Sequence, residues 1–261
     1  MFYYGKIATK IICSIGLSTL SIMDVSKLNI YPLGDQAVTI QLSDQIDPST
    51  HQQVVQIFHY LQNQSLKWIT DIIPAYSSIT IVYDLASLPS PSTFSSRYEW
   101  IKSILIQNIE SMNTTIMIGR QIKIPVCYDL SVGPDLIELS QHCKLSIEEV
   151  IYKHTQQSYT VYMIGFLPGF PYMASIDPSI QMNRKAEPRQ KVPKGSVGIA
   201  GAQTGIYPMD SPGGWQIIGQ TPVNLFNLST PNPCLLAPGD SVEFYAISLD
   251  DFLKIKSIEN T

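Results

Sequence analysis

Residues 165–172 combine aromatic side chains with residues that favour turns, in the order Gly-Phe-Leu-Pro-Gly-Phe-Pro-Tyr. Glycine allows close approach of the backbone, proline stiffens a loop, and Phe170 and Tyr172 offer flat contact surfaces. Such a loop can form the wall of a ligand pocket. It can also be a tightly packed corner of a β-barrel, and the residue types by themselves favour this second interpretation.

Cations gather in the segment that follows. Residues 184–194 hold five cations and one acid, in a chain whose net charge is −4. The cations are Arg184, Lys185, Arg189, Lys191 and Lys194, and the acid is Glu187. This local positive charge could hold a carboxylate, a phosphate or bicarbonate, and the fork of arginine suits planar anions best. A solvated basic loop is the alternative interpretation.

Glycine is concentrated in the same part of the chain. Nine of the 15 glycines lie between residues 165 and 219, and Gly198, Gly201 and Gly205 could turn backbone N–H groups toward an anion. The segment is not a P-loop, because it lacks the Gly-Lys-Ser/Thr ending, and the spacing of a dinucleotide fingerprint is absent. The number of glycines therefore does not predict a nucleotide site.

His154 is the histidine with the most informative position. Counted from Ile147, it shares a predicted helix face with Val150 and Ile151. A histidine on an apolar stripe is more often a core residue than a catalyst, and a general base is the alternative. No Ser-His-Asp set, carboxylate pair or metal-ligand spacing stands out. Residue spacing therefore does not name a reaction.

The elements that must position these side chains begin with a small α+β layer at residues 30–112. Alternation over 38–42 and over 79–83 predicts strands with one buried face. Asp47 followed by Pro48 predicts the start of a helix, whose apolar stripe continues to residue 61. A second stripe predicts a helix over 98–109, after a Pro/Ser-rich loop. We expect both helices on one face of the sheet.

A second pattern begins after residue 116, where we place the domain boundary. Alternation over 122–126 predicts a strand, Gly133-Pro134-Asp135 opens a short helix, and Ser146 with Glu149 forms a capping box before the next helix. From residue 160 onward the chain is mostly short strands separated by glycine and proline. This pattern is typical of a β-barrel or a β-sandwich.

Composition limits the classes of function. Hydrophobic residues make up 44% and charged residues 15%, which supports a large core and leaves a surface with few charges. Such a surface is covered by a partner, or it simply reflects a large interior. The net acidic charge argues against broad nucleic-acid binding, and no apolar run reaches the 18 residues of a membrane span. The four cysteines are too far apart for a zinc site or a disulfide framework, and free thiols fit a reducing cytoplasm.

Residues 1–27 differ from the rest of the chain. Lys6 and Lys10 precede an apolar run at 11–23, as in a secretory signal, but no cleavage site follows. Met23 offers a second start. We expect a disordered extension or a non-native start, with an ordered extension and a signal as alternatives.

Several motifs in this order resemble the family of the 5-oxoprolinase B subunit (PxpB), KipI and allophanate hydrolase subunit 1, which carries carboxyltransferase subdomains C and D. The resemblance extends from about residue 28 to 252. It rests on Ile30-Tyr31-Pro32-Leu33-Gly34-Asp35, on residues 165–172, on Pro188-Arg189 with Val192-Pro193 and Gly195-Ser196-Val197, on Gln203-Thr204-Gly205-Ile206-Tyr207-Pro208, on Ser211-Pro212-Gly213-Gly214-Trp215 and on Ile218-Gly219 with Thr221-Pro222.

The resemblance implies an α+β N-terminal domain at 28–116, a mainly-β cyclophilin-like barrel at 117–254 and a tail at 255–261. It implies a cytoplasmic, non-autonomous subunit of an ATP-dependent enzyme that opens 5-oxoproline to L-glutamate. The partners would be a KipA / allophanate hydrolase subunit 2-like (PxpC-like) subunit and a LamB/YcsF-like (PxpA-like) subunit. ATP would be shared with them, and no metal motif is seen. The alternatives are a KipI-like inhibitor of a sporulation histidine kinase and a carboxyltransferase component of a biotin-dependent urea or allophanate pathway.

Within this resemblance the expected site joins the aromatic, cationic and glycine-rich segments. We expect Arg189 to contact an anion, Gln203 to bind a carbonyl or amide, and His154 to serve as a general base. The expected substrate-binding residues are Phe170, Tyr172, Gly201, Thr204 and Gly205. Two residues depart from the family pattern, Ala202 in place of glycine and Lys194 in place of alanine. A methyl group at position 202 is tolerated where φ is negative and costs roughly 1 kcal/mol or more where φ is positive.

Overall fold

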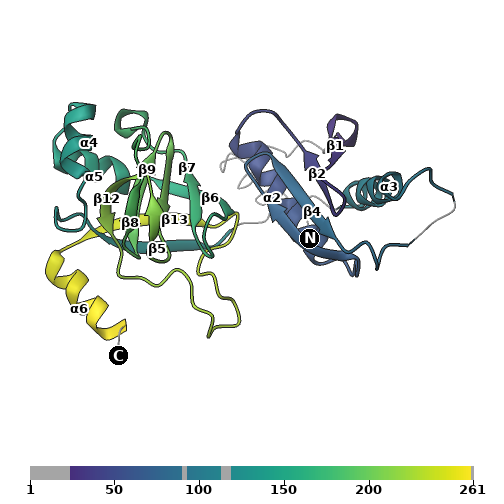
Figure 1. The fold of residues 1–261 in the computed structure, drawn as a ribbon. Helices are drawn as coiled ribbons and strands as arrows, with labels where there is room; N and C mark the ends of the chain where they lie inside the picture. Colours follow the sequence, from purple (N-terminus) through teal and green to yellow (C-terminus); the bar gives the residue numbers. More distant parts are fainter. Residues whose placement is uncertain (1–23, 90–92, 113–118, 260–261) are drawn as a thin grey trace, which may run out of the picture.

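The computed structural model describes residues 24–89, 93–112 and 119–259, which form two domains side by side (Figure 1). The predicted boundary near residue 116 and residues 1–23 of the predicted extension lie outside the described residues. Residues 25–27 of that extension form a short 3-10 helix, η1 (Val25–Lys27). At the other end, helix α6 (Leu249–Glu259) occupies most of the predicted tail.

The N-terminal domain is a four-stranded antiparallel sheet with two helices. The strands lie in the order β1-β2-β4-β3. Its elements are β1 (Asn29–Pro32), β2 (Ala37–Gln41), α2 (Pro48–Gln62), β3 (Ile69–Pro74), β4 (Ser78–Tyr83) and α3 (Arg97–Glu110). The predicted strands and helices are confirmed. Strands β1 and β3 add the two edges of the sheet.

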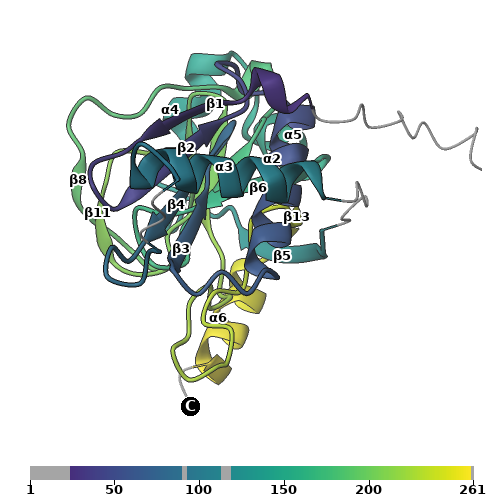
Figure 2. The same cartoon turned by 90° about the vertical axis from the view of Figure 1, so that its right-hand side faces the viewer.

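Both helices of this domain cover the same face of the sheet. Burial alternates along β4, where Ile79 and Ile81 are fully buried, and these side chains share one core cluster with Ile57 of α2 and Leu105 of α3. Figure 2, which looks along the molecule, shows both helices on the sheet. Helix α2 begins where the sequence predicts, because the Asp47 carboxylate accepts a hydrogen bond of 2.8 Å from the Thr50 N–H.

The C-terminal domain is a closed barrel whose strands follow the order β10-β7-β6-β13-β5-β12-β9. Neighbouring strands are antiparallel except β5 and β13, which run parallel from Gln121 beside Ser241 to Cys127 beside Ile247. The strands are β5 (Gln121–Cys127), β6 (Ser158–Ile164), β7 (Pro171–Ala174), β9 (Ser196–Ala200), β10 (Gln203–Ile206), β12 (Gln216–Gln220) and β13 (Ser241–Ile247). The prediction of a mainly-β second domain is confirmed.

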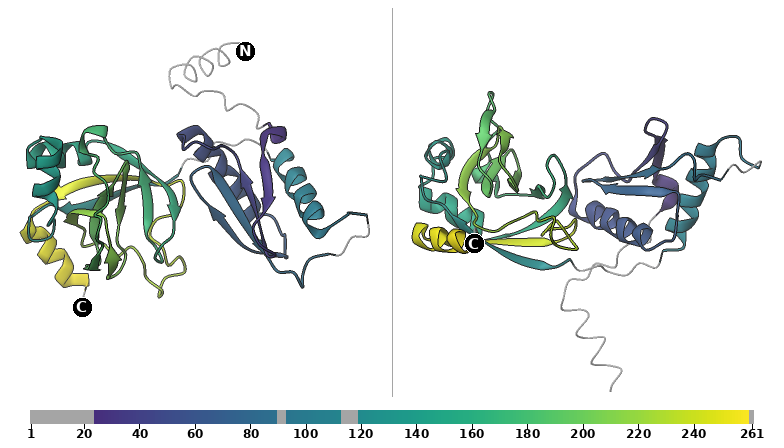
Figure 3. Two further views of the ribbon diagram at one scale, coloured as in Figure 1. Left: turned by 45° about the horizontal axis from the view of Figure 1, so that its top comes forward. Right: turned by 60° about the horizontal axis from the view of Figure 1, so that its bottom comes forward.

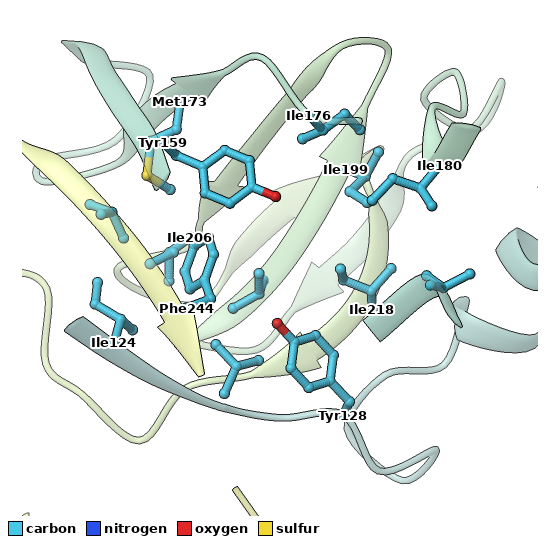
Figure 4. Packing of buried hydrophobic residues seen from close by; sticks show 14 of the residues in the cluster. Ile124, Tyr128, Tyr159, Met173, Ile176, Ile180, Ile199, Ile206, Ile218 and Phe244 are labelled. Atoms are coloured by element: carbon cyan, nitrogen blue, oxygen red, sulfur yellow. The ribbon is translucent and has the colours of Figure 1, made fainter. Parts of the chain in front are cut away.

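Five further elements belong to this domain. They are α4 (Leu136–Cys143), α5 (Ile147–Thr155), η2 (Pro178–Ile180) and the small sheet of β8 (Arg189–Val192) with β11 (Ser211–Gly213). The predicted capping box is present, since the Ser146 N–H donates to Glu149 at 2.7 Å and the Glu149 N–H donates to Ser146 at 3.1 Å. Figure 4 shows branched aliphatic side chains and the rings of Tyr128, Tyr159 and Phe244 filling the barrel.

The two domains touch through α2 and the β3–β4 turn, which lie against β6 and β10. The His51 ring lies 4.3 Å from the Tyr162 ring, and its Nε2 is 3.3 Å from the Val161 carbonyl oxygen. The Tyr76 ring lies 5.3 Å from the same tyrosine, and Gln203 Nε2 donates a hydrogen bond to the Tyr76 hydroxyl. Figure 3 shows this side-by-side arrangement from two directions. Within the described ranges, no helix has the length and apolar character of a membrane span.

Candidate functional site

An aromatic pocket of about 380 Å³ lies beside the β8–β11 sheet. It brings together the three segments that the sequence singles out. Its walls are Phe166, Leu167, Tyr172, Arg184, Pro188, Tyr207, Ser211, Pro212, Gly213, Gly214 and Trp215. We call this set the aromatic pocket.

Phe170 packs against three of the rings that line this pocket. It is 1% exposed, and its ring centroid lies 4.9 Å from Tyr172, 5.2 Å from Tyr207 and 5.4 Å from Trp215, each in an edge-on arrangement. Edge-to-face contacts of this kind stabilise a fixed relative orientation of the rings. Residues 165–172 are therefore both a packed barrel corner and a pocket wall, because Phe170 packs inward while Phe166 is 63% exposed.

Gly205 lies directly against the rings of Phe170 and Trp215. A Cβ atom there would come within 2.9 Å of Phe170 Cζ, 2.9 Å of the Pro171 carbonyl oxygen and 3.0 Å of Trp215 Cζ3. Two of these neighbours are ring atoms and the third is backbone of the paired strand β7, so none can move without disturbing the pocket. The position therefore requires glycine.

Gly205→Ala is expected to lower the free energy of unfolding by about 1–3 kcal/mol through overpacking. It should also push Phe170 and Trp215 apart, which will change the fluorescence of Trp215. Chemical denaturation and emission spectra of the purified chain measure both effects. Gly201→Ala is the matched control, because a Cβ there meets no atom within 4 Å and its φ of +59° adds only local strain. Equal emission changes in both variants would contradict this role of Gly205.

Most of the cationic segment is neutralised by nearby acids. Arg189 Nη2 pairs with Asp135, and Lys185 Nζ lies 3.1 Å from Asp135 and 2.9 Å from Glu138. The Asp135 side chain is only 3% exposed, and its second oxygen accepts a hydrogen bond of 2.6 Å from the Ile217 N–H. These cations therefore hold the loop to α4 and β12, so the segment is not simply a solvated basic loop.

Arg189, the predicted anion contact, lies beside the aromatic pocket and not in its wall. Its side chain is 29% exposed, and its Nη1 atom has no hydrogen-bond partner among the described residues. Burial raises the pKa of the Tyr207 hydroxyl, and the nearby charges of Arg184 and Arg189 oppose that rise. Arg189 is thus held beside the pocket by Asp135, and its charge acts on the hydroxyl group of Tyr207.

His154 and Thr204 are fully buried in the barrel. The Thr204 hydroxyl donates to the Gly198 carbonyl at 3.1 Å, so it accepts the 3.0 Å hydrogen bond from His154 Nε2–H. His154 Nδ1 then accepts from the Tyr128 hydroxyl at 2.7 Å. Burial lowers the pKa of His154 to about 3, which keeps the ring neutral. In this conformation neither residue reaches a ligand, in agreement with the core interpretation of His154.

Gln203 and Gly201 do not line the aromatic pocket. Gln203 is engaged with Tyr76 across the domain contact. Gly201 lines a second hollow of about 660 Å³, whose wall also includes Arg184, Lys185 and Gln216. Ala202 is not among the described residues with positive φ, so the methyl group that departs from the family pattern fits without strain.

Three of the cysteines lie within the described residues. Burial raises the pKa of the thiols of Cys127, Cys143 and Cys234, so they are weak nucleophiles, and all three are free. In the part of the chain that the structure describes, His, Cys, Asp and Glu side chains do not gather in groups of three or more suited to a metal ion.

The sequence did not single out Arg184, Tyr207 and Trp215 as pocket residues. Arg184 was one of five equivalent cations, and the two aromatic residues appeared only within the motifs that carry the family resemblance. The available signal was their shared neighbourhood of glycine and proline, which allows loops to approach each other closely. These three side chains come together only in the folded barrel, so their proximity could not be predicted from the sequence.

Comparison with known proteins gives a consistent result. Residues 28–236 match the model of the carboxyltransferase domain, subdomain C and D. The 5-oxoprolinase B subunit of Bacillus subtilis (strain 168) is 39% identical over 237 residues, which cover 90% of this chain and 99% of that protein. The 5-oxoprolinase B subunit of Escherichia coli O157:H7 is 34% identical and is covered to 96%, with 84% of this chain. The crystal structure of TTHA0988 superposes with a TM-score of 0.71 at 30% identity, over 82% of this chain and 40% of that one.

Proposed function

The chain belongs to the family of carboxyltransferase domains, subdomain C and D, and on this premise we propose that it is the B subunit of a 5-oxoprolinase, an enzyme that opens 5-oxoproline to L-glutamate. The observation that carries this proposal is the 39% identity to the 5-oxoprolinase B subunit of Bacillus subtilis over 99% of that protein's length. The aromatic pocket supplies a place where a small cyclic amide can bind. We place the enzyme in the cytoplasm, where free thiols persist.

ATP would provide the activation that an unstrained amide needs. The lactam oxygen attacks the terminal phosphoryl group, and ADP leaves. Water then adds to the activated carbon, the ring C–N bond breaks, and the nitrogen takes up a proton. A second water hydrolyses the acyl phosphate that remains, which gives glutamate and inorganic phosphate. The phosphoryl transfer and the hydrolysis of the acyl phosphate place negative charge on oxygens, so fixed cations and N–H donors would supply the main stabilisation there.

This chain would position the substrate, and the partner subunits would carry out the phosphate chemistry. Tyr172 is the predicted binding residue that lines the aromatic pocket, while Gly201 lines the neighbouring hollow. Phe170, Gly205, Thr204 and His154 would act by holding these walls in place. Arg189 would support the site electrostatically, and Gln203 would fix the domain contact. The partners would be a KipA-like and a LamB/YcsF-like subunit, which share ATP with this chain.

Glutamate release that depends on both 5-oxoproline and ATP is expected only when the chain is co-expressed with both partners. The chain by itself should be inert, because its described residues contain no phosphate loop and no accessible catalytic set. An enzyme-coupled glutamate assay on the purified complex, on each pair of subunits and on the single chain measures this. Turnover by the single chain at ordinary enzyme rates would contradict the division of labour. An inactive three-subunit complex would contradict the proposed function itself.

A further inference from the structure

Arg184 is the cation of residues 184–194 whose side chain lines the aromatic pocket. It also borders the hollow that contains Gly201, so it lies where the two cavities meet. The rest of the aromatic pocket consists of rings, prolines, glycines, one leucine and one serine. A guanidinium group is therefore the charged feature that a ligand in this pocket would encounter.

The backbone on both sides of Arg184 is hydrogen-bonded to the two chain neighbours of Trp215, Gly214 and Gln216. The Asn183 carbonyl accepts a hydrogen bond of 2.8 Å from Gln216 Nε2, and the Lys185 N–H donates one of 2.7 Å to the Gly214 carbonyl. One residue further back, Met182 forms a β-bridge with Gly201. The side chain of Arg184 is exposed, while the backbone groups of both its chain neighbours are hydrogen-bonded.

The charge of Arg184 is not balanced by an acid in the described structure. Lys185 and Arg189 pair with Asp135, and Lys191 pairs with Asp210 at 2.8 Å, whereas no carboxylate within the described ranges pairs with Arg184. Burial raises the pKa of the Tyr172 hydroxyl, and Arg184 opposes that rise, which agrees with its location beside the pocket. A fixed backbone, an uncompensated guanidinium and an aromatic wall are the parts of an anion-binding site.

We propose that Arg184 binds the carboxylate of a small cyclic amide whose ring lies against Tyr172 and Trp215. The planar fork of arginine pairs with a carboxylate through two hydrogen bonds. The two rings, with centroids 5.9 Å apart, offer apolar faces for a five-membered ring. A nucleotide triphosphate fits less well, because several negative charges would meet one free guanidinium. This inference rests on the proposed function and names the group that selects the substrate within it.

The test uses the assembled three-subunit complex with Arg184→Ala, Arg184→Lys and Arg97→Ala. Arg97→Ala removes the same kind of charge from the exposed start of α3, which belongs to the N-terminal domain and does not line the pocket. The KM for 5-oxoproline is expected to rise by about 100-fold in Arg184→Ala, the scale of a lost charge-assisted hydrogen-bond pair. The KM should rise less in Arg184→Lys and remain within about twofold in Arg97→Ala. The KM for ATP should be unchanged in all three variants.

Other outcomes overturn the inference in distinguishable ways. An unchanged KM for 5-oxoproline in Arg184→Ala shows that the guanidinium does not contact the substrate. A raised KM for ATP assigns the pocket to the nucleotide. Failure of Arg184→Ala to assemble, seen by gel filtration while Arg97→Ala assembles, makes Arg184 an interface residue. If the wild-type complex does not convert 5-oxoproline, the proposed function fails first and this inference falls with it.

Discussion

Asp135→Ala is expected to lower the free energy of unfolding by about 3–5 kcal/mol, the usual cost of removing one partner from a buried ion pair. The carboxylate is 3% exposed and holds three groups together, Arg189, Lys185 and the Ile217 N–H. Its removal leaves a half-buried guanidinium without its acid and a buried N–H without an acceptor. Lys185 can still pair with Glu138, so the larger part of the loss falls on Arg189 and Ile217.

Chemical denaturation of the purified chain measures this change, and Asp210→Ala is the matched control. Asp210 also pairs with a lysine of the cationic segment, but both side chains are largely exposed, 51% for Asp210 and 72% for Lys191. Exposed pairs contribute about 1 kcal/mol or less. Asp135→Asn should fall between the two, because an amide oxygen can still accept from the Ile217 N–H. Similar losses in Asp135→Ala and Asp210→Ala would show that the buried pair is not an anchor.

Acid is expected to destabilise the protein through His154 as the pH falls from about 6.5 toward 3. Burial lowers the pKa of this ring from the ordinary value of 6.5 to about 3 in the folded state. The unfolded chain therefore binds more protons than the folded chain within this window. The contribution of the neutral His154 ring to the free energy of unfolding is fully present above about pH 6.5. On acidification this contribution falls by up to about 1.4 kcal/mol per pH unit.

His154→Gln isolates this effect. Glutamine can keep a hydrogen bond to Tyr128 or Thr204 and does not titrate, so the variant should be less stable than the wild type at pH 7. Its disadvantage should shrink steadily in denaturation curves at pH 6, 5 and 4. Burial also lowers the pKa of His51 and His59, but both residues are present in both proteins, so their contributions cancel. Parallel pH profiles for the two proteins would contradict the assignment.

Local sequence signals predicted the elements whose causes are local. Asp47 with Pro48 and Ser146 with Glu149 mark helix starts that need no tertiary information. Strand β3 was not predicted, because as an edge strand it lacks a regular alternation of buried and exposed residues. Helix α6 was not predicted either, because it buries little more than Phe252 and its apolar residues Leu253 and Ile258 face solvent.

The structure has a pocket where the aromatic and cationic segments meet, and its role in the reaction stays a proposal. The sequence predicted that Arg189 and the Gly201–Gly205 segment take part in this site. It could not distinguish Arg184 from Arg189, because the two are the same residue type in one loop. What separates them is Asp135, which lies 54 residues away in the chain and pairs with only one of them. The burial and neutral state of His154 likewise depend on Tyr128, which follows β5, and on Thr204 of β10, and the fold brings both to the histidine.

The parallel pairing of β5 with β13 has a consequence for how the protein is made. Strand β5, the first barrel strand in the sequence, begins at Gln121. One of its two edges is paired with β13, which begins only at Ser241. A ribosome adds the intervening residues in roughly 6–24 s, at 5–20 residues per second. The N-terminal domain has all of its strands and helices before that interval begins. Throughout the interval β5 has a free hydrogen-bonding edge, so the barrel of the nascent chain stays open until β13 has been translated.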